Sequence, residues 1–384
     1  MSTIKVTNIE HASTANGGIQ LDNAGHVTVD GQQMPTSGPL SNRNLVINGA
    51  MQVAQRGTSN SDLNSYATVD RFRLKRVLTD NLVGTQQQST TAPAGFSNSY
   101  KVDITTAEGT LSADEFFSMR HLIEAQNLQH LDYNTSDAKA VTLSFWVRSH
   151  VTGTYAVGIE NPDGSRNIAK TYSVSSADTW EHKIITFPGD TGGANPNNDN
   201  GIGFQIDWYL AAGSNFTSSN GSTWAAKNNN RRAHGQSANA IGTTGSFYLT
   251  GVQLEVGEKA TPFEHRSFGD ELARCQRYFC RSYAYGIATG SSGNNGAVSS
   301  TAYGSATYAS AGTATFPVEM RATPSVTIYG TGGTQGKVNA DSGEGTGQAA
   351  FINSRHVFLA RNNDGTGVAV NVYLKAHYTA NAEL

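Results

Sequence analysis

The segment VTLSFWVRS, residues Val141–Ser149, decides the fold. Apolar side chains occupy every second position, which is the period of a β-strand with one buried face. One face would carry Val141, Leu143, Phe145 and Val147, and the other would carry Thr142, Ser144, Trp146 and Arg148. A half-buried strand of this kind requires a sheet around it and a second layer over its apolar face.

Further strand patterns follow this segment. TYAVGIENPDGSRNIAKTYSV (Thr154–Val174) is predicted to form a hairpin whose turn is Asn161–Gly164. WEHKIITFPGD (Trp180–Asp190) and GIGFQIDWYL (Gly201–Leu210) are further strands. Turn signals at these intervals are typical of sandwiches and barrels. We therefore predict a central jelly-roll β-sandwich over residues 43–266.

The segment LSADEFFSMRHLIEAQNLQHL, residues Leu111–Leu131, is predicted to be a helix within this domain. Ser112 followed by acidic residues resembles a helix start. Apolar residues then recur at helical spacing, namely Phe116, Met119, Leu122 and Ile123. The alternative is a strand with a polar edge, followed by a short helical turn.

A second helix is predicted over residues 267–283, where FGDELARCQRYFCRSY shows helical spacing. Asp270 and Glu271 in its first turn suit the positive end of the helix dipole. Residues 284–384 return to strand patterns and include a hairpin turn at Asn363-Asp364-Gly365. We predict a connecting helix followed by a C-terminal distal β-sandwich domain.

The two cysteines, Cys275 and Cys280, lie on this helix five positions apart. Side chains at that spacing point in different directions, so we expect two buried thiols and no intrachain disulfide. A structural zinc site requires about four nitrogen or sulfur ligands, so we expect no metal. Asp163 could bind calcium in its turn, although a plain Asx turn is the simpler interpretation. We expect no cofactor.

The composition indicates an all-β protein. Among 384 residues there are 41 Gly, 15 Tyr and 15 Phe, and charged residues make up 15%. The formal net charge of −3 argues against nucleic acid as a partner, because such partners require a clustered basic surface. No apolar run approaches the ~20 residues of a membrane helix, so we expect no membrane insertion, and the N-terminus shows no leader pattern.

Residues 1–42 are predicted to be a separate anchoring module with its linker. IKVTNI, GGIQLD and HVTVDG are short alternating strands that carry few large apolar residues. A segment this short cannot build its own core, so its apolar side chains need a partner. The predicted anchoring or oligomer contacts are Ile4, Val6, Ile9, Ile19, Leu21, Val27 and Val29. Three copies around one axis would bury them, and we expect a homotrimer.

Three segments together resemble a family of bacteriophage tail-fibre proteins. NLVINGAMQVAQRG (Asn44–Gly57) with TVDRFRL (Thr68–Leu74) resembles the opening of the family's jelly-roll domain. SFYLTGVQLEVGEKATPFEHRSFGDELARCQRYF (Ser246–Phe279) resembles its last strand and exit helix, and FPVEMRATP (Phe316–Pro324) a strand of the distal domain. The N-terminal module resembles the anchoring segment of fibres from marine phages. The resemblance implies a homotrimeric virion protein attached to the phage tail or to an adaptor or nozzle protein.

No enzyme motif is present in the sequence. A G-x-S-x-G elbow, H-E-x-x-H, C-x-x-C and a Walker loop are all absent. Glycosidases use two carboxylates at a defined separation, which a sequence cannot display. We therefore expect a protein that is not an enzyme.

Aromatic residues suggest a glycan site, because sugar C–H faces stack on aromatic rings. Trp208 and Tyr209 precede a long polar loop, Ser214–Gly242, which contains Trp224, Arg231 and Arg232. The alternative is that the tryptophans are packed inside and that the arginines are solvated or meet a partner chain. Trp146 and Trp180 lie at strand positions, where packing is the favoured interpretation.

The predicted function is that of a structural virion protein. The fibre would be made in the bacterial host cytoplasm, dock to the phage tail by its N-terminus and bind host surface polysaccharide without cleaving it. One rival is a structural connector or decoration protein of the virion that binds no receptor. The other is a glycan-cleaving tailspike.

Overall fold

The structure is a computed structural model that describes residues 8–9, 18–23, 25–35, 40–77, 81–301, 308–340, 343–362 and 372–384. The protein is all-β, with 42% strand and 7% helix, which confirms the predicted fold class. The chain divides into two compact units. The first comprises Met1–Met51, Ser61–Ser65 and Phe72–Arg266, and the second comprises Gln52–Asn60, Tyr66–Arg71 and Ser267–Leu384.

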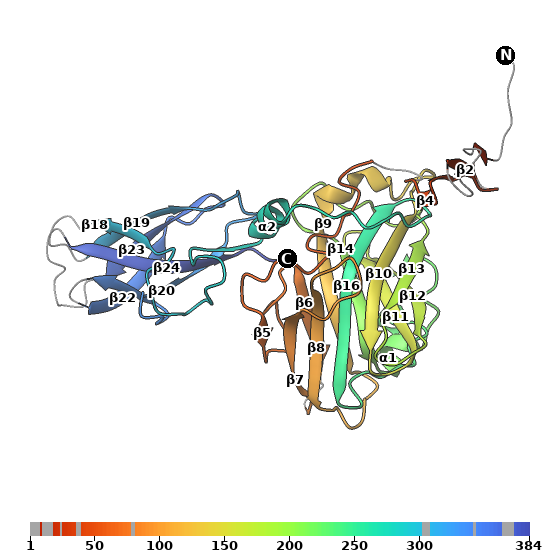
Figure 1. Cartoon of the computed structure of the whole chain (residues 1–384), viewed down its shortest axis with the longest axis horizontal. Helices are drawn as coiled ribbons and strands as arrows, with labels where there is room; N and C mark the ends of the chain where they lie inside the picture. Colours follow the sequence, from red (N-terminus) through yellow and green to blue (C-terminus); the bar gives the residue numbers. More distant parts are fainter. Residues whose placement is uncertain are drawn as a thin grey trace, which may run out of the picture. The chain divides into compact units, whose positions relative to one another are not determined.

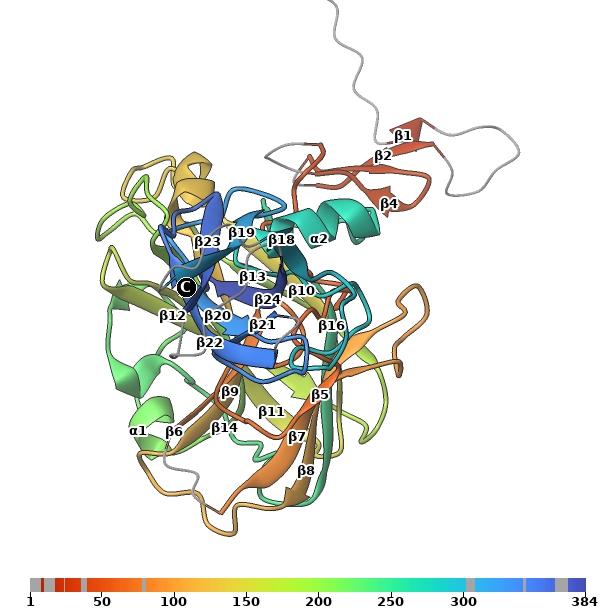
Figure 2. The same ribbon diagram turned by 90° about the vertical axis from the view of Figure 1, so that its left-hand side faces the viewer.

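The first unit contains two antiparallel sheets packed face to face (Figures 1 and 2). One sheet places β13 (Glu181–Phe187), β10 (Val141–Ser149), β16 (Gly245–Val256), β8 (Ser99–Thr106) and β7 (Val83–Ser89) side by side. The other has the order β15 (Ala225–Ala226), β12 (Arg166–Val174), β11 (Gly153–Asn161), β14 (Ile202–Ala212), β9 (Phe116–Glu124) and β6 (Phe72–Val77). We call them the β10 sheet and the β14 sheet. Short helices α1 (Ser214–Thr217) and η2 (Asn229–Arg231) lie in the long polar loop.

The core of this unit lies between the two sheets. The alternation predicted for β10 is present, because Val141, Leu143, Phe145 and Val147 are fully buried. Phe145 of the β10 sheet meets Trp208 of the β14 sheet edge to face, with ring centroids 6.0 Å apart. Trp146 and Arg148 point the other way and remain partly exposed. The predicted hairpin is also present, since β11 and β12 pair around the turn after Asn161.

The helix predicted over Leu111–Leu131 is wrong, and the strand alternative is confirmed. The segment forms strand β9, which is followed by the 3₁₀ helix η1 (Ala125–Leu131). β9 lies between β14 and β6, and its residues are buried on both faces. A strand covered on both faces has no alternation of polar and apolar residues, so its apolar spacing resembled a helix.

The connecting helix α2 (Phe268–Gln276) is shorter than predicted. Ser267 caps its start, because the Ser267 hydroxyl accepts a hydrogen bond from the Asp270 amide. The helix ends at Arg277, and Phe279–Arg281 forms β17 against residues 379–381 of β24 (Tyr373–Asn381). Cys275 and Cys280 are therefore on different elements, and both are buried free thiols.

The second unit is a β domain built around β24. Its strands have the order β17, β24, β21 (Lys337–Ala340), β22 (Gly343–Ala350), β23 (His356–Asn362) and β19 (Tyr308–Thr315). β18 (Val298–Thr301) and β20 (Ser325–Tyr329) also pair with β24, and β5 (Ser59–Asn60) belongs to this unit. Its core includes Phe316, Met320, Leu359 and Leu374. The predicted turn at Asn363–Gly365 lies outside the described residues.

Arg56, Arg71 and Glu383 form a charged cluster in this unit. The buried guanidinium of Arg71 lies over the Tyr278 ring, 3.4 Å from its centroid, and forms an ion pair with Glu383. Arg56 reaches the same carboxylate at 3.2 Å and covers the Phe279 ring at 3.7 Å. The cluster fastens segments 52–60 and 66–71 to the strands of the second unit.

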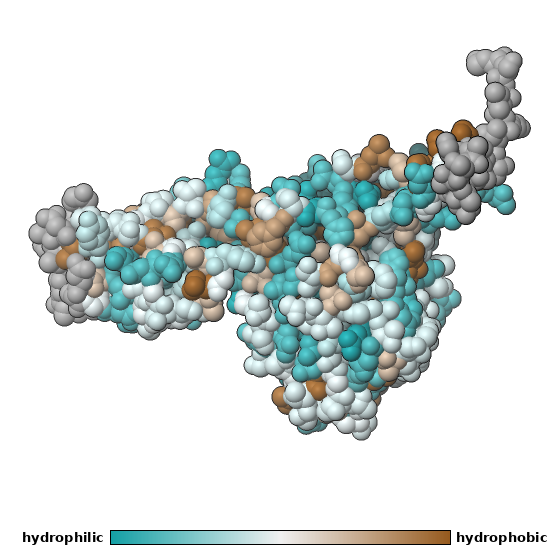
Figure 3. All heavy atoms as spheres, in the orientation of Figure 1, coloured by the Kyte–Doolittle hydropathy of each residue, from teal (hydrophilic) through white to brown (hydrophobic). Residues whose placement is uncertain are grey.

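The N-terminal module forms a small antiparallel sheet. Its strands are β1 (Asn8–Ile9), β2 (Ile19–Leu21), β3 (Val27–Val29) and β4 (Gln32–Gln33). Asp30 and Gly31 join β3 to β4 with φ of 49° and 76°, which is the turn chemistry expected of Asp-Gly. Ile9, Ile19 and Leu21 are 59%, 42% and 37% exposed. Figure 3 shows hydrophobic atoms in brown at these strands.

Val27 and Val29 of the same sheet are half-buried, and Ile4 and Val6 lie outside the described residues. Across the parts of the chain that are described, none of the helices has the length and apolar character needed to cross a membrane.

Candidate functional sites on the β-sandwich

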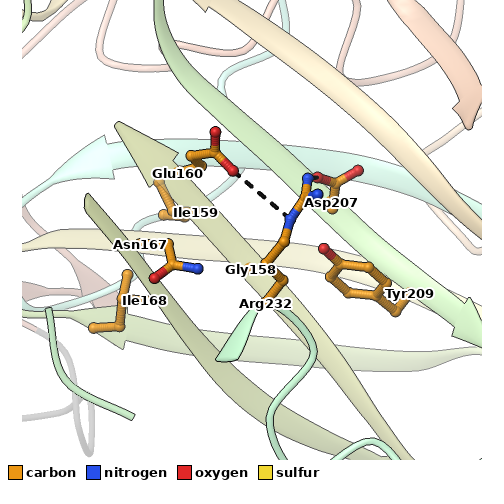
Figure 4. A pocket seen from close by; sticks show the side chains of 8 residues that line it. All are labelled: Gly158, Ile159, Glu160, Asn167, Ile168, Asp207, Tyr209 and Arg232. Carbon is orange, nitrogen blue, oxygen red and sulfur yellow. Dashed lines mark ion pairs between the residues drawn. The ribbon is translucent and has the colours of Figure 1, made fainter. Parts of the chain in front are cut away.

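A small pocket opens on the outer face of the β14 sheet (Figure 4). Strand pairing builds its floor, because Gly158 of β11 lies opposite Asp207 of β14. The chain after η2 crosses above this floor and brings Arg232 over the strands. The residues that shape its chemistry are Gly158, Glu160, Asn167, Asp207, Tyr209 and Arg232.

Arg232 lies between two carboxylates in this pocket. Its Nε is 3.7 Å from Glu160 Oε2, and its Nη2 is 3.6 Å from Asp207 Oδ2. Asp207 also accepts two hydrogen bonds from Arg120, at 2.8 and 3.2 Å. Glu160 forms a second ion pair with Lys227. Both carboxylates are thus held by cations.

The electrostatics of the pocket keep Asp207 ionised. Burial alone would raise the pKa of this carboxyl, but the Arg120 and Arg232 cations and the hydrogen bonds from Arg120 and Ser118 lower the pKa below its usual value. A carboxyl with a lowered pKa carries no proton at neutral pH. Asp207 is therefore unsuited to act as a general acid.

Two buried oxygen atoms of the pocket are available as acceptors. Neither Glu160 Oε2 nor Asn167 Oδ1 receives a hydrogen bond from any residue that the structure describes. The two residues are 6% and 2% exposed. Buried acceptors normally have a donor, so these atoms suit an ordered water molecule. The enclosed space is only about 10 Å³, which is room for about one water molecule and not for a sugar ring.

The structure separates the five residues predicted for glycan binding. Tyr209 and Arg232 line the pocket. Trp208 is fully buried in the sandwich core, so it cannot stack on a sugar there, and its predicted role is corrected. The Trp208 ring points to the inner face of β14, where it contacts Phe72 and Phe145.

Trp224 and Arg231 hold the long polar loop together. The indole Nε1 of Trp224 donates to the Pro188 carbonyl at 2.7 Å, and the ring packs on Tyr133 and Phe204. The Arg231 guanidinium donates to three backbone carbonyls, those of Asn220, Thr223 and Ala226. Arg231 is 8% exposed, so it is a loop anchor and not a surface cation.

A second surface lies on the outer face of the β10 sheet, which we call the aromatic face. It consists of Trp146, Trp180, His182 and Tyr248. Trp146 lies opposite His182 across β10 and β13, with ring centroids 5.0 Å apart. Trp180 meets Tyr248 of β16 edge to face at 5.9 Å. Trp146 and Trp180 are half-buried, His182 is exposed and Tyr248 is buried at 8% exposure, so the first three residues are the ones open to solvent.

Gly251 makes room for this arrangement. Its φ is +60°, and a Cβ atom there would lie 2.7 Å from Phe96 Cζ and 2.9 Å from Trp146 Cδ1. Glycine adopts this φ readily, and its lack of a Cβ atom leaves space for both rings. The Phe96 ring extends the apolar surface to Phe263 at 5.0 Å.

The charges beside the aromatic face are balanced pair by pair. Arg148 lies 3.6 Å from Asp178 and Lys101 lies 3.1 Å from Asp103, while the Lys183–Glu181 pair, at 2.6 Å, lies on the other face of β13. Partial burial and the nearby Lys183 cation lower the pKa of His182, so its imidazole is neutral at pH 7. The face thus combines ring surface with hydrogen-bonding groups and no excess charge, which suits neutral sugar rings.

The sequence reasoning favoured packing for Trp146 and Trp180 and missed this face. The alternation of VTLSFWVRS already directs Trp146 away from the core. The sequence pattern does not reveal the strand register that places His182 beside Trp146, because the β11–β12 hairpin separates β10 from β13 in the chain.

Among the described residues, the two thiols and the Ser282–His377 pair also lack the surroundings of a catalytic site. Burial raises the pKa of Cys275 well above its usual value and that of Cys280 to about 12, so neither thiol ionises at neutral pH. Ser282 Oγ is 3.2 Å from His377 Nδ1, but the other ring nitrogen faces the Gly293 carbonyl and not a carboxylate. No cluster of three His, Cys, Asp or Glu side chains suitable for a metal occurs among the described residues.

No protein-family model matches the chain, and no curated protein does. Among solved structures, it is similar to the enzymatically active domain of tailspike protein 4 of bacteriophage CBA120. The identity is 12% over 56% of this chain and 21% of that chain, with a TM-score of 0.31. The chain thus spans about a fifth of that tailspike structure.

Two carbohydrate-binding modules are also similar. TmCBM61 in complex with β-1,4-galactotriose shows 7% identity over 56% of this chain and 99% of that chain, with a TM-score of 0.28. The family 11 module from Clostridium thermocellum, in complex with a β-1,3-1,4-mixed-linked tetrasaccharide, shows 9% identity over 54% and 99%, with a TM-score of 0.26.

Proposed function

We propose that this protein is a bacteriophage tail fibre whose β-sandwich binds a cell-surface polysaccharide and does not cleave it. The observation that carries the binding proposal is the aromatic face. Two half-buried tryptophans and an exposed, neutral histidine are gathered on one outward sheet face, and the nearby Arg148 is paired with Asp178. Stacking of sugar C–H faces on such rings requires no cleft, so a long polymer can bind at any point along its length.

The state of the pocket carboxylates supports a protein that is not an enzyme. Glycoside hydrolysis uses one carboxylic acid that keeps its proton and one free carboxylate. Asp207 is fixed by Arg120 and Arg232 with a lowered pKa, and Glu160 is paired with Lys227 and Arg232. Neither carboxylate matches the role of a protonated acid.

The place in the virion rests on the sequence segments that resemble tail-fibre proteins and on the N-terminal sheet. The strands of that sheet expose Ile9, Ile19 and Leu21 in the single chain. Three copies around one axis would bury these side chains and complete the edge hydrogen bonds. The N-terminal sheet would then dock to the phage tail or to an adaptor or nozzle protein.

Binding of the intact chain to purified host polysaccharide, with a parallel assay for new reducing ends, tests the function. Binding without new reducing ends is expected. Release of reducing sugar would favour the glycan-cleaving tailspike, and a virion protein without any glycan affinity would favour the structural connector.

A further inference from the structure

The loop before β8 brings a further ring to the side of Trp146. Strand register places Thr250 of β16 opposite Trp146 of β10, so both side chains point to the outer side of the sheet. Thr250 Oγ1 donates a hydrogen bond to the Asn98 carbonyl at 2.7 Å, which fixes the loop on this side. The Cβ position of Gly251 is 2.7 Å from Phe96 Cζ and 2.9 Å from Trp146 Cδ1. Phe96 of the loop and Trp146 therefore flank the same glycine.

The segment that follows β16 adds two more rings. The Glu264 amide donates a hydrogen bond to Gln253 Oε1 at 2.8 Å, which holds this segment against the strand. The Phe263 ring centroid is 5.0 Å from that of Phe96, and the His265 ring is 4.8 Å from Phe263. His265 also lies 5.3 Å from Phe96. The three rings thus form one group next to Trp146.

These rings continue the aromatic face as a row across the outer side of the β10 sheet, which we call the aromatic row. Its members are His182, Trp146, Phe96, Phe263 and His265, all in the first unit. The two histidines are exposed and the other three residues are half-buried, so each member keeps some surface open to solvent. Neighbouring centroids are 5.0 Å apart both at His182–Trp146 and at Phe96–Phe263, which is close to the length of one sugar unit in a linear glycan. The row therefore offers stacking surface to about three successive sugars.

The polar groups of the row suit uncharged sugars. The imidazoles of His182 and His265 make no side-chain hydrogen bond with any residue in the described parts of the chain. Their ring nitrogens are thus open to sugar hydroxyl groups at the two ends of the row. The ionised residues next to these histidines in the chain are paired with each other, Glu181 with Lys183 and Glu264 with Arg266.

We infer that the aromatic row is one continuous platform for the interior of a linear, uncharged glycan, with Phe96, Phe263 and His265 as additional sugar-binding residues. The inference rests on the proposed glycan binding and adds the ligand class and the second half of the site. Stacking recognises the C–H faces of successive sugars and not the end of a chain, so a long polymer can bind by an internal stretch. A single sugar covers only part of the row and binds weakly.

The test uses oligosaccharides of graded length from partial acid hydrolysis of host polysaccharide, separated into neutral and acidic fractions by anion exchange. Each fraction is titrated calorimetrically into the intact chain. The affinity for neutral oligosaccharides should rise about fivefold with each added sugar up to about three sugars and change little beyond that length. Raising the salt to about 0.5 M should leave these affinities unchanged, because no charge contact is involved.

Phe263→Ala should weaken binding of the trisaccharide and longer oligosaccharides about fivefold. The disaccharide should lose little, because it can still bind over Trp146 and His182. A general loss of structure would not produce this dependence on length. His265→Ala changes an exposed side chain, so it tests the same end of the row without a packing defect and should act in the same direction. Phe268→Ala, at a phenylalanine that is 41% exposed and outside the row, is the matched control and should bind every length as the parent does.

Three results would each overturn the inference. They are an affinity of the intact chain that does not depend on length, full affinity of both Phe263→Ala and His265→Ala for long neutral oligosaccharides, and binding confined to the acidic fraction. If one of them occurs while Trp146→Ala still weakens binding of the whole polysaccharide, only the inference fails. If the intact chain binds no form of host polysaccharide, the inference and the proposed function fail together.

Discussion

The backbone carbonyl oxygen of Arg232 lies 2.6 Å from the position that a Cβ atom on Gly158 would occupy. No real Cβ atom approaches a backbone oxygen this closely, so residue 158 must lack a side chain for the loop to cross the sheet at this height. Arg232 is held over Asp207 and Glu160 by this close approach. The charge arrangement of the pocket therefore depends on one glycine in the middle of β11.

Gly158→Ala should lower the free energy of unfolding by about 1–3 kcal/mol, because the loop must move away from the strand. Denaturant unfolding measures this change. Gly109→Ala is the control, since its Cβ position has no atom within 4 Å. The control should change stability by no more than about 0.5 kcal/mol. Equal stability of the Gly158 variant and the parent would show that the loop is not fixed by this contact.

Asp207 should make the first unit sensitive to acid. Its folded-state pKa lies below the ordinary value of 3.8, so the unfolded chain takes up the proton first as the pH falls. The stabilisation is thus present above about pH 4 and is lost as the pH drops toward the folded-state pKa.

Asp207→Asn leaves Arg120 without its buried partner and should lose about 3 kcal/mol at pH 7. The deficit should shrink below pH 4 in urea unfolding curves. Asp178→Asn, at a side chain that is 57% exposed, is the control and should follow the parent at every pH. If the loss in free energy of unfolding caused by Asp207→Asn is the same from pH 7 to pH 3, this explanation is contradicted.

Glu383 should stabilise the second unit through Arg71. Arg71 is fully buried against the Tyr278 ring, and Glu383 neutralises it. Glu383→Gln should lower stability by about 3–5 kcal/mol, since it leaves an uncompensated buried charge. Thermal unfolding followed by tyrosine fluorescence detects the change. Glu319→Gln breaks the exposed Glu319–Arg355 pair and should have no measurable effect. Two variants of equal stability would refute the role of the cluster.

Strands with one solvent face could be predicted from the sequence, because their period is visible. The alternation of β10 placed Val141 inside and Trp146 outside, as the structure has them. β9 could not be identified in this way. Its position between β14 and β6 is set by distant segments, and burial on both faces removed the alternation. Phe279–Arg281 was predicted to be helical and is a strand. The sequence pattern could not reveal this, because the strand pairs with residues 379–381, about 100 positions away.

Prediction of the candidate sites would have required the strand register even more than prediction of the fold. Tyr209 and Arg232 were predicted as site residues, but Gly158, Glu160 and Asn167 were not. These three residues have no motif, and only the pairing of β11 with β12 and β14 brings them under Arg232. Trp208 was predicted to bind glycan, but it lies in the core. Neighbouring side chains of a strand point to opposite faces, so when Tyr209 lies on the outer face of β14, Trp208 must face the core.

The exposed apolar residues of the N-terminal sheet predict a homotrimer. Light scattering of the intact chain should give three times the chain mass of 40.7 kDa. Deletion of residues 1–40 should leave a folded, soluble body that no longer assembles onto virions. A mass near 40.7 kDa for the intact chain would contradict the trimer, and normal virion incorporation of the truncated chain would contradict the docking role.

Calorimetric titration of host polysaccharide into the intact chain and its Trp146→Ala variant tests the central claim most directly. The loss of one stacking ring should weaken binding about tenfold, while the melting temperature stays close to that of the parent. Trp180→Ala should act in the same direction, because its ring belongs to the same face. Tyr285→Ala, at a side chain that is 61% exposed in the second unit, is the control and should bind as the parent does. Unchanged affinity in both tryptophan variants, with the parent binding normally, would contradict the assignment of the aromatic face as the glycan site.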